Sequence, residues 1–284
     1  MYEDELTWLR HLFAQHAVFA SGGEDRRLEA ALAEIPREDF LGSGPWQLAI
    51  LGSENSTVYR RTPDANPHWL YQDCLVGIVP EKELNNGVPS FLTYLISLGQ
   101  VNEGEHVVHI GAGLGYYTAV LAKLAGDRGR VTAIEFEPEL AQRARINLAR
   151  LSRVEVHQGD GATMDLGSAD VVLVNAGATK PADNWVGALA DGGRLILPLT
   201  TKAVSGGDGI VFLIERRGDQ YSAAAKSRVG MYHCVGARDP DSEAALTKAL
   251  ESGGVDRVRF LRRTDDAPDD ICWVRWPRWA LTYE

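Results

Sequence analysis

The stretch Val107-Val108-His109-Ile110-Gly111-Ala112-Gly113-Leu114-Gly115-Tyr116-Tyr117 decides the fold of this chain. It opens with an apolar run, passes through three glycines at alternate positions and continues as an apolar helical pattern to Leu124. That order is typical of a buried parallel strand, a tight turn and a helix. Glycines let the turn bend sharply and let a ligand lie against bare backbone, and the helix N-terminus beyond them favours a carboxylate or phosphate. The stretch therefore predicts a site for a ligand with a nucleoside and a polar group.

The chain after this stretch alternates between strand and helix patterns. Strands are expected at 129–135, 154–161 (a strand with its turn), 169–177 and 194–199, with helices at 137–151 and 185–189. The strand from 169 is nearly all apolar, which favours a central position. Alternation of this kind predicts an α/β protein with a doubly wound, Rossmann-like sheet.

The flanking regions are expected to add to this core. Residues 4–34 have the pattern of N-terminal helices broken at Gly22-Gly23, residues 42–86 are irregular, and Ser90 is a candidate N-cap for a helix that reaches Leu98. We expect three parts: an N-terminal helical and irregular segment (1–84), a ligand-binding core (85–235) and a C-terminal α/β extension (236–284).

Beyond Thr200 the sequence pattern changes from alternating strands and helices to mainly consecutive strands. Additional strands are expected at 209–215, 221–228, 255–262 and 271–283, with a possible extension of the sheet at 231–235 and a helix at 241–252. Trp273, Trp276 and Trp279 recur at a three-residue spacing. Packing against the body of the protein is the simplest expectation for them.

Composition narrows the classes of function. The 284 residues are 45% hydrophobic with a formal net charge of -10, which argues against nucleic acid as the main partner, because Lys and Arg dominate affinity for phosphate backbones. Cys74, Cys234 and Cys272 lack the spacing of a zinc site, and we expect reduced thiols and no metal. The acidic N-terminus is unlike a signal peptide, and no apolar run approaches the ~20 residues that span a bilayer. We therefore expect a cytoplasmic protein.

A glycine loop by itself does not distinguish a nicotinamide site from an S-adenosylmethionine site. Both place an acid at the end of the second strand, and Glu135 lies 22 positions after Gly113 (135 − 113). Gly159-Asp160-Gly161 lies where a methyltransferase recognises adenine, since a carboxylate can accept from the exocyclic amine while the backbone N–H donates to the ring. This later segment favours S-adenosylmethionine.

Taken together, these motifs resemble the protein-L-isoaspartate O-methyltransferase family. The similar segments keep the family's order: IPREDFL (35–41), YQD (71–73), HIGAGLGYYTAVLAKLAG (109–126), VTAIEFEPELAQRARINL (131–148), VEVHQGDGAT (154–163) and DGGRLILPLT (191–200). The resemblance implies methylation of a carboxylate, in isoaspartyl residues of damaged proteins or peptides, by S-adenosyl-L-methionine. It also implies a cofactor site formed by His109, Gly111, Ala112, Gly113, Gly115, Tyr116, Glu135, Phe136, Asp160, Gly161 and Asn175. The acceptor would lie against Asn85, Asn86, Gly87, Val88 and Ser90.

The sequence departs from the family pattern in two places, at His109 and in the segment 85–89. His109 stands where an acid usually helps to hold the methionyl ammonium, and a neutral imidazole supplies no negative charge. The family's hydroxyl motif becomes Asn85-Asn86-Gly87-Val88-Pro89, which alters the expected acceptor contacts.

Alternatives therefore stay open. The acceptor can be another peptide or a small molecule, the fold can bind nicotinamide as an oxidoreductase, or turnover can be lost. No general base is expected, because a carboxylate nucleophile is already ionised at neutral pH.

Overall fold

The computed structural model describes residues 3–51, 57–82, 84–201 and 209–284. Its central feature is a set of parallel strands: β5 (His106–Ile110), β6 (Arg130–Glu135), β7 (Val154–Gln158), β8 (Ala169–Val174) and β9 (Leu189–Leu199). They lie in the order β7-β6-β5-β8-β9. This is the order of a doubly wound sheet, in which ligands bind beyond the carboxyl ends of the strands near the point where the order reverses. The order reverses between β5 and β8. This topology confirms the expected doubly wound α/β fold.

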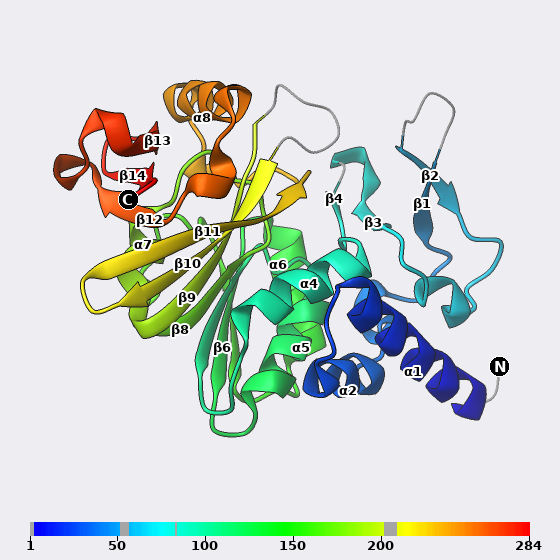
Figure 1. The fold of residues 1–284 in the computed structure, drawn as a ribbon. Coiled ribbons are helices and arrows are strands. Elements are labelled where there is room, and N and C mark those ends of the chain that lie inside the picture. Colours follow the sequence, from blue (N-terminus) through cyan, green and yellow to red (C-terminus); the bar gives the residue numbers. More distant parts are fainter. Residues whose placement is uncertain (1–2, 52–56, 83, 202–208) are drawn as a thin grey trace.

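Antiparallel strands continue the same sheet on one side: β10 (Gly209–Arg217), β11 (Gln220–Val229), β12 (Phe260–Arg263), β13 (Cys272–Arg275) and β14 (Trp279–Thr282). In the described residues the sheet has ten strands, in the order β13-β14-β12-β11-β10-β9-β8-β5-β6-β7 (Figure 1). The strands of the C-terminal extension thus belong to the sheet of the ligand-binding core.

Helices cover both faces of the sheet. The helices are α1 (Glu3–Ala20), α2 (Arg26–Glu34), α3 (Glu38–Leu41), α4 (Pro89–Gly99), α5 (Tyr116–Ala125), α6 (Pro138–Leu148), α7 (Asp183–Ala188) and α8 (Pro240–Ser252). Side chains from α1, α2, α4, α5 and α6 form one core cluster with Val107. Val108 and Ile110 point to the other face, into a cluster with α7, α8 and the C-terminal tryptophans. This alternation along β5 explains the continuous apolar run, because both faces of the strand are buried.

A second, four-stranded sheet has the order β2-β1-β3-β4. It consists of β1 (Gln47–Leu51), β2 (Thr57–Arg61), β3 (Val76–Val79) and β4 (Leu84–Asn85), and Figure 1 shows it next to α1. The expectation that residues 42–86 are irregular was therefore wrong. Strands of two to five residues are too short to leave a clear alternating pattern.

Other boundaries also differ from the sequence expectation. Residues 231–235 form no strand and contribute only an isolated bridge between His233 and Gly177. Residues 255–262 divide into a 3-10 turn at Val255–Arg257 and the strand β12, and residues 271–283 form the hairpin of β13 and β14. Trp273, Trp276 and Trp279 are buried, as expected. None of the described helices is long and apolar enough to cross a membrane.

Candidate functional site

The glycine loop leaves the carboxyl end of β5 in a conformation that side chains disfavour. Gly111 has a φ of 78°, and a Cβ there would lie 2.9 Å from the backbone oxygen of Asn175. The Asn175 backbone N–H donates to Ile110 and its side-chain amide to the Gly111 carbonyl oxygen, at 3.2 Å. The loop therefore passes so close to the end of β8 that only glycine fits.

Glu135, at the end of β6, holds the loop from the other side. One carboxylate oxygen accepts from the Gly113 N–H at 2.7 Å and the other from the Glu137 N–H at 3.0 Å. The side chain is only 7% exposed, and burial raises its pKa despite these backbone hydrogen bonds. The sequence-predicted acid thus lies directly against the sequence-predicted glycines.

The turn after β7 forms the next part of the site. Asp160 accepts from the Ala162 N–H at 2.9 Å, and the Gly161 carbonyl accepts from the Trp185 indole at 2.8 Å. A Cβ on Gly161 would lie 2.7 Å from the Ile110 side chain, so this turn also needs a small residue. A Cβ on Gly236 would overlap the Asp160 carboxylate, which places the segment after β11 directly on the turn.

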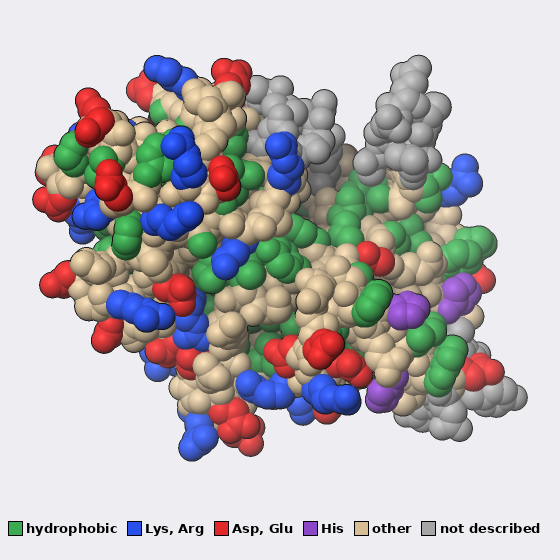
Figure 2. Space-filling view, viewed as in Figure 1, with side chains coloured by type: hydrophobic (Ala, Val, Ile, Leu, Met, Phe, Trp, Pro, Cys, Tyr) green, Lys and Arg blue, Asp and Glu red, His purple; other side chains and the backbone are tan. Residues whose placement is uncertain are grey.

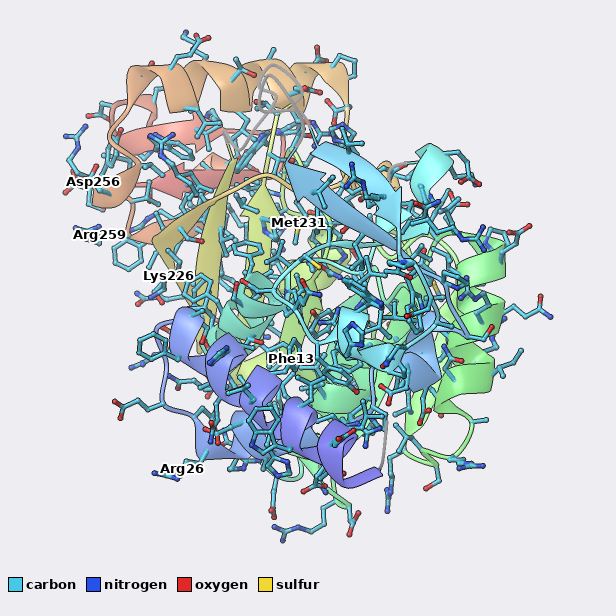
Figure 3. The ribbon with its side chains drawn as sticks, turned by 90° about the vertical axis from the view of Figure 1, so that its right-hand side faces the viewer. Phe13, Arg26, Lys226, Met231, Asp256 and Arg259 are labelled. Atoms are coloured by element: carbon cyan, nitrogen blue, oxygen red, sulfur yellow. The ribbon has the colours of Figure 1, made fainter. Side chains whose placement is uncertain are left out.

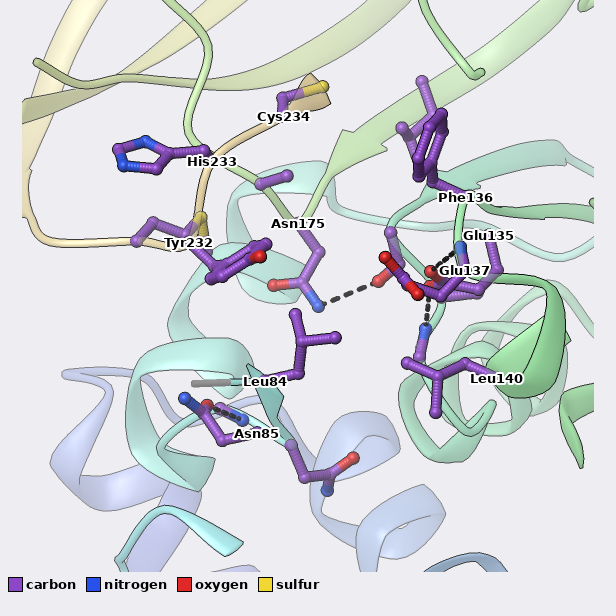
Figure 4. A pocket seen from close by; sticks show the side chains of 18 of the residues that line it. Leu84, Asn85, Glu135, Phe136, Glu137, Leu140, Asn175, Tyr232, His233 and Cys234 are labelled. Carbon is purple, nitrogen blue, oxygen red and sulfur yellow. Dashed lines mark hydrogen bonds between the residues drawn. The ribbon is translucent and has the colours of Figure 1, made fainter. Parts of the chain in front are cut away.

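These elements surround a pocket of about 400 Å³ at the carboxyl ends of β5, β6, β7 and β8. In Figure 4, Glu135, Phe136, Glu137 and Leu140 lie on one side of the pocket and Tyr232, His233 and Cys234 on the other. Asn175 lies between them. A pocket of this size, with polar groups converging from several strand ends, suits a nucleoside-containing ligand.

Most of the sequence-predicted site residues come together here. The predicted residues that line the pocket are Gly111, Ala112, Gly113, Glu135, Phe136, Asp160, Gly161, Asn175, Asn85, Asn86, Gly87 and Val88. Asn86 is 7% exposed, and its side-chain Nδ2 has no hydrogen-bond partner within the described residues. An unpaired buried donor in a pocket wall indicates a group suited to a ligand's acceptor atom.

Four predicted residues lie elsewhere. His109, Gly115, Tyr116 and Ser90 are not among the described residues that line the pocket. His109 shares the face of β5 on which Val107 packs against α5, and its Nδ1 lies 2.9 Å from the Thr118 hydroxyl in α5. The Ser90 N–H and hydroxyl both donate to Asp73, and α4 begins at Pro89 with Val88 as its N-cap, so the prediction of Ser90 as N-cap was wrong.

The segment 228–236 was not foreseen as part of the site. It contributes Arg228, Tyr232, His233 and Cys234 to the pocket wall. Its position depends on backbone bonds with a distant loop, because Gly177 donates to the Tyr232 carbonyl and accepts from the Cys234 N–H. Nothing in the local sequence indicates that pairing. Burial raises the pKa of Cys234 to about 11, so its thiol is not a nucleophile at neutral pH.

Comparison with known proteins agrees with this geometry. The sequence model of the family described as protein-L-isoaspartate(D-aspartate) O-methyltransferase matches residues 15–239. A protein-L-isoaspartate O-methyltransferase of Halorhodospira halophila is 31% identical over 211 residues, 72% of this chain and 82% of the relative. The enzyme of the same name from Ignicoccus hospitalis is 27% identical over 203 residues, 70% and 83% of the two chains.

Solved structures show the same fold. One protein-L-isoaspartate O-methyltransferase superimposes with a TM-score of 0.64 at 21% identity, covering 88% of this chain and 70% of that one. A beta-aspartate methyltransferase from Plasmodium falciparum, in complex with S-adenosyl-L-homocysteine, gives 0.61 at 14% identity and covers 79% and 97%. With its glycine loop, its strand-end acids and a family match over residues 15–239, the chain belongs to the protein-L-isoaspartate O-methyltransferase family of S-adenosylmethionine-dependent enzymes.

Proposed function

We propose that this enzyme methylates a carboxylate of a peptide or protein, with isoaspartyl residues of damaged proteins as the acceptor class. The observation that carries the proposal is the pocket in which the bare backbone of Gly111 and Gly113 faces Glu135 and Asp160. Membership of the family leaves no role for the nicotinamide alternative considered above.

The residues present fit S-adenosylmethionine. In the proposal, Gly111 and Gly113 lie against the methionyl part, Glu135 accepts from the ribose hydroxyls, and Asp160 with the Gly161 N–H recognises adenine. Phe136 is 43% exposed at the pocket wall, where its ring can cover the nucleoside. Support comes from the positions of these groups at adjacent strand ends and from their order around the pocket.

The acceptor lies at the opposite end of the pocket in this proposal. When bound, the cofactor supplies an electrophilic methyl group. The chain's own residues then position the acceptor oxygen and exclude water, which is a proximity effect. Asn86 offers its unpaired Nδ2 to the acceptor carboxylate, and Asn85 is held in place because its side-chain oxygen accepts from the Gly87 N–H at 2.9 Å. No proton needs to move, because the carboxylate is ionised at neutral pH.

Calorimetry with S-adenosylhomocysteine tests the cofactor half. Glu135→Gln removes the charge from the predicted ribose contact, and we expect binding about 10- to 100-fold weaker, since a hydrogen bond to a charged group contributes roughly 1.5–3 kcal/mol. Glu139→Gln is the matched control, because Glu139 is exposed and is not among the described pocket-lining residues. Equal affinities for the two variants would contradict the assigned role of Glu135.

Methyl transfer from labelled cofactor tests the acceptor half. An isoaspartyl peptide and the same peptide with ordinary aspartate should differ, with transfer to the isoaspartyl form alone. Binding of the cofactor without transfer to either peptide would favour the alternative of another peptide or a small-molecule acceptor. The altered segment 85–89 is the observation that supports that alternative.

A further inference from the structure

Tyr117 brings a second unpaired polar group to the pocket. It lies in the first turn of α5, lines the pocket and is only 3% exposed. Its hydroxyl oxygen is buried and has no hydrogen-bond partner in the described part of the chain. Among the described lining residues, only Asn86 shares this property. Because buried polar groups are normally paired, such a hydroxyl in a pocket wall indicates a donor for a bound group.

The ring of Tyr117 is held in place by its neighbours. It packs edge-on against the Tyr116 ring, with centroids 4.9 Å apart, and Tyr116 packs in the same way against Phe40 at 5.7 Å. All three residues belong to one buried core cluster. Burial raises the pKa of Tyr117 to about 12, so the hydroxyl keeps its proton at neutral pH. The pocket wall therefore contains a fixed hydrogen-bond donor.

A buried cation near Tyr117 favours an anion at its hydroxyl. Arg37 is fully buried, and none of its three side-chain nitrogens has a hydrogen-bond partner within the described residues. Its guanidinium lies 5.0 Å from the ring centroid of Phe13 on α1 (Figure 3) and 5.5 Å from that of Tyr116. Burial has the largest effect on the pKa of Tyr117, but Arg37 lowers this pKa more than Asp73 raises it. Charges act more strongly in the interior than in water, so these two give a net positive potential at the hydroxyl.

Asp73 connects Tyr117 with the segment 84–88. It is close enough to Tyr117 to act on the pKa of the phenol, and it also accepts from the Ser90 N–H at 2.7 Å in the first turn of α4. Residues 84–88 directly precede α4, line the pocket and include Asn86. Both unpaired donors therefore belong to the end of the pocket at which the acceptor is proposed to bind.

Other charges at the pocket offer an anionic acceptor little. Glu135 and Glu137 line it near the end of β6, and Figure 4 shows them apart from Asn85 at the acceptor end. Arg228 also lines the pocket but already takes part in another interaction. The chain carries a net charge of -10, and Lys and Arg are interspersed with Asp and Glu over the face in Figure 2. A mixed surface of this kind does not attract a carboxylate, so local donors such as the Tyr117 hydroxyl have to hold it.

We propose that the Tyr117 hydroxyl donates a hydrogen bond to the acceptor carboxylate and thereby selects a carboxylate over its neutral amide. This role rests on the proposed methyl transfer to a peptide carboxylate. The bond goes to the oxygen that does not attack, because the attacking oxygen must face the methyl group. A carboxylate that accepts a methyl group becomes a neutral ester, so the hydrogen bond is stronger before transfer than during it. Loss of the hydroxyl therefore raises KM and leaves kcat close to wild type.

The first test measures peptide binding without turnover. Fluorescence anisotropy of the S-adenosylhomocysteine-loaded protein compares an isoaspartyl peptide with the same peptide in which the free carboxylate is replaced by its amide. Wild type should prefer the carboxylate peptide. Tyr117→Phe should bind the carboxylate peptide about 10-fold more weakly and the amide peptide about 2-fold more weakly, because a hydrogen bond to a charged group is the stronger kind. An equal loss for both peptides would overturn the proposal.

Two measurements separate this role from a structural or cofactor-binding one. Tyr117→Phe removes an unpaired buried hydroxyl, so its Tm should not fall below that of wild type. Calorimetry should give the wild-type affinity for S-adenosylhomocysteine, and a 10-fold loss would assign the hydroxyl to the cofactor instead. Tyr94→Phe is the matched control, because it removes a phenol hydroxyl from α4 outside the described pocket lining. The control should keep the wild-type preference between the peptides.

Kinetics separate this proposal from the methyl transfer on which it rests. Wild type should methylate the isoaspartyl peptide, and Tyr117→Phe should raise KM about 10-fold with kcat within about 3-fold of wild type. A wild type that prefers the carboxylate peptide, loses this preference in Tyr117→Phe and methylates neither peptide refutes the methyl transfer and leaves the donor role supported. Methylation of the isoaspartyl peptide with the same KM in both proteins refutes the donor role alone.

Discussion

His109 is a buried residue whose chemistry is decided by its surroundings. Its side chain is fully buried, its Nδ1 lies 2.9 Å from the Thr118 hydroxyl, and its Nε2 has no partner in the described residues. Burial lowers its pKa from 6.5 to about 4. The imidazole is therefore neutral at neutral pH, and it lies on the face of β5 that α5 covers, outside the described lining of the pocket.

This pKa makes stability depend on pH. As the pH falls below 6.5, His109 becomes protonated in the unfolded chain, whereas in the folded chain it stays neutral until about pH 4. The stability that is present above pH 6.5 is therefore lost as the pH falls from 6.5 to about 4. The free energy of unfolding falls by up to roughly 3 kcal/mol, because a difference of one pKa unit between the folded and unfolded states corresponds to about 1.36 kcal/mol. Urea unfolding between pH 7 and pH 4 should show a shallower decline for His109→Asn than for wild type. His11→Asn, at an exposed position, should follow wild type; a His109→Asn curve parallel to wild type would contradict this account.

At the scale of elements, α4 depends on a residue far from it in sequence. Asp73 accepts from the Ser90 N–H at 2.7 Å and from its hydroxyl at 2.6 Å. These bonds satisfy one of the unpaired N–H groups in the first turn and place a negative charge at the helix N-terminus. They also hold the beginning of α4 against the loop that contains Asp73. Residues 84–88, which directly precede α4, line the pocket.

Removing this contact should cost stability in a graded way. Asp73→Ala should lower the free energy of unfolding by about 1 kcal/mol, as capping substitutions do, and Ser90→Ala by less, because the backbone bond remains. Urea denaturation measures both. Gln72→Ala, at the neighbouring exposed position, is the control and should match wild type. A larger loss for Ser90→Ala than for Asp73→Ala would show that the hydroxyl, not the backbone bond, dominates.

On the scale of the whole molecule, the C-terminal extension is part of the core. Trp273, Trp276 and Trp279 are 7%, 4% and 3% exposed, and Trp273 lies 5.7 Å from Phe212 between ring centroids. β12 pairs with β11, so the extension also covers the edge of the sheet. Each buried tryptophan contributes on the order of 3–5 kcal/mol, and together they rival the roughly 5–15 kcal/mol that stabilises a typical domain.

Deletion of residues 240–284 should therefore abolish folding, although the family match ends at residue 239. We expect the shortened chain to aggregate and to bind no S-adenosylhomocysteine, because removing the extension exposes β11 and the apolar face below it. Full-length protein should unfold in one transition with coincident circular dichroism and tryptophan fluorescence. A soluble 1–239 chain that unfolds cooperatively and binds the ligand would show that the extension is dispensable.

Local patterns in the sequence predicted the parallel core and the residues that meet in the pocket at the carboxyl ends of its strands. Gly111 and Glu135 were foreseen because each lies at a strand end, and carboxyl ends of parallel strands meet at one edge. Asp160 was predicted from its place in Gly159-Asp160-Gly161, where a methyltransferase recognises adenine. The N-terminal helices could also be predicted from the sequence, because their apolar residues recur at helical spacing.

Only the tertiary structure decided the rest. The face of β5 on which the His109 side chain lies depends on which helices pack against each face. Alternation along a strand shows that neighbouring side chains lie on opposite faces, but it does not show which buried face borders the pocket. Arg228 reaches the pocket through a bulge opposite a distant strand, and Tyr232 through a backbone bond to Gly177. Such contacts join residues far apart in the chain, so their geometry arises from packing of the assembled sheet and not from any local pattern.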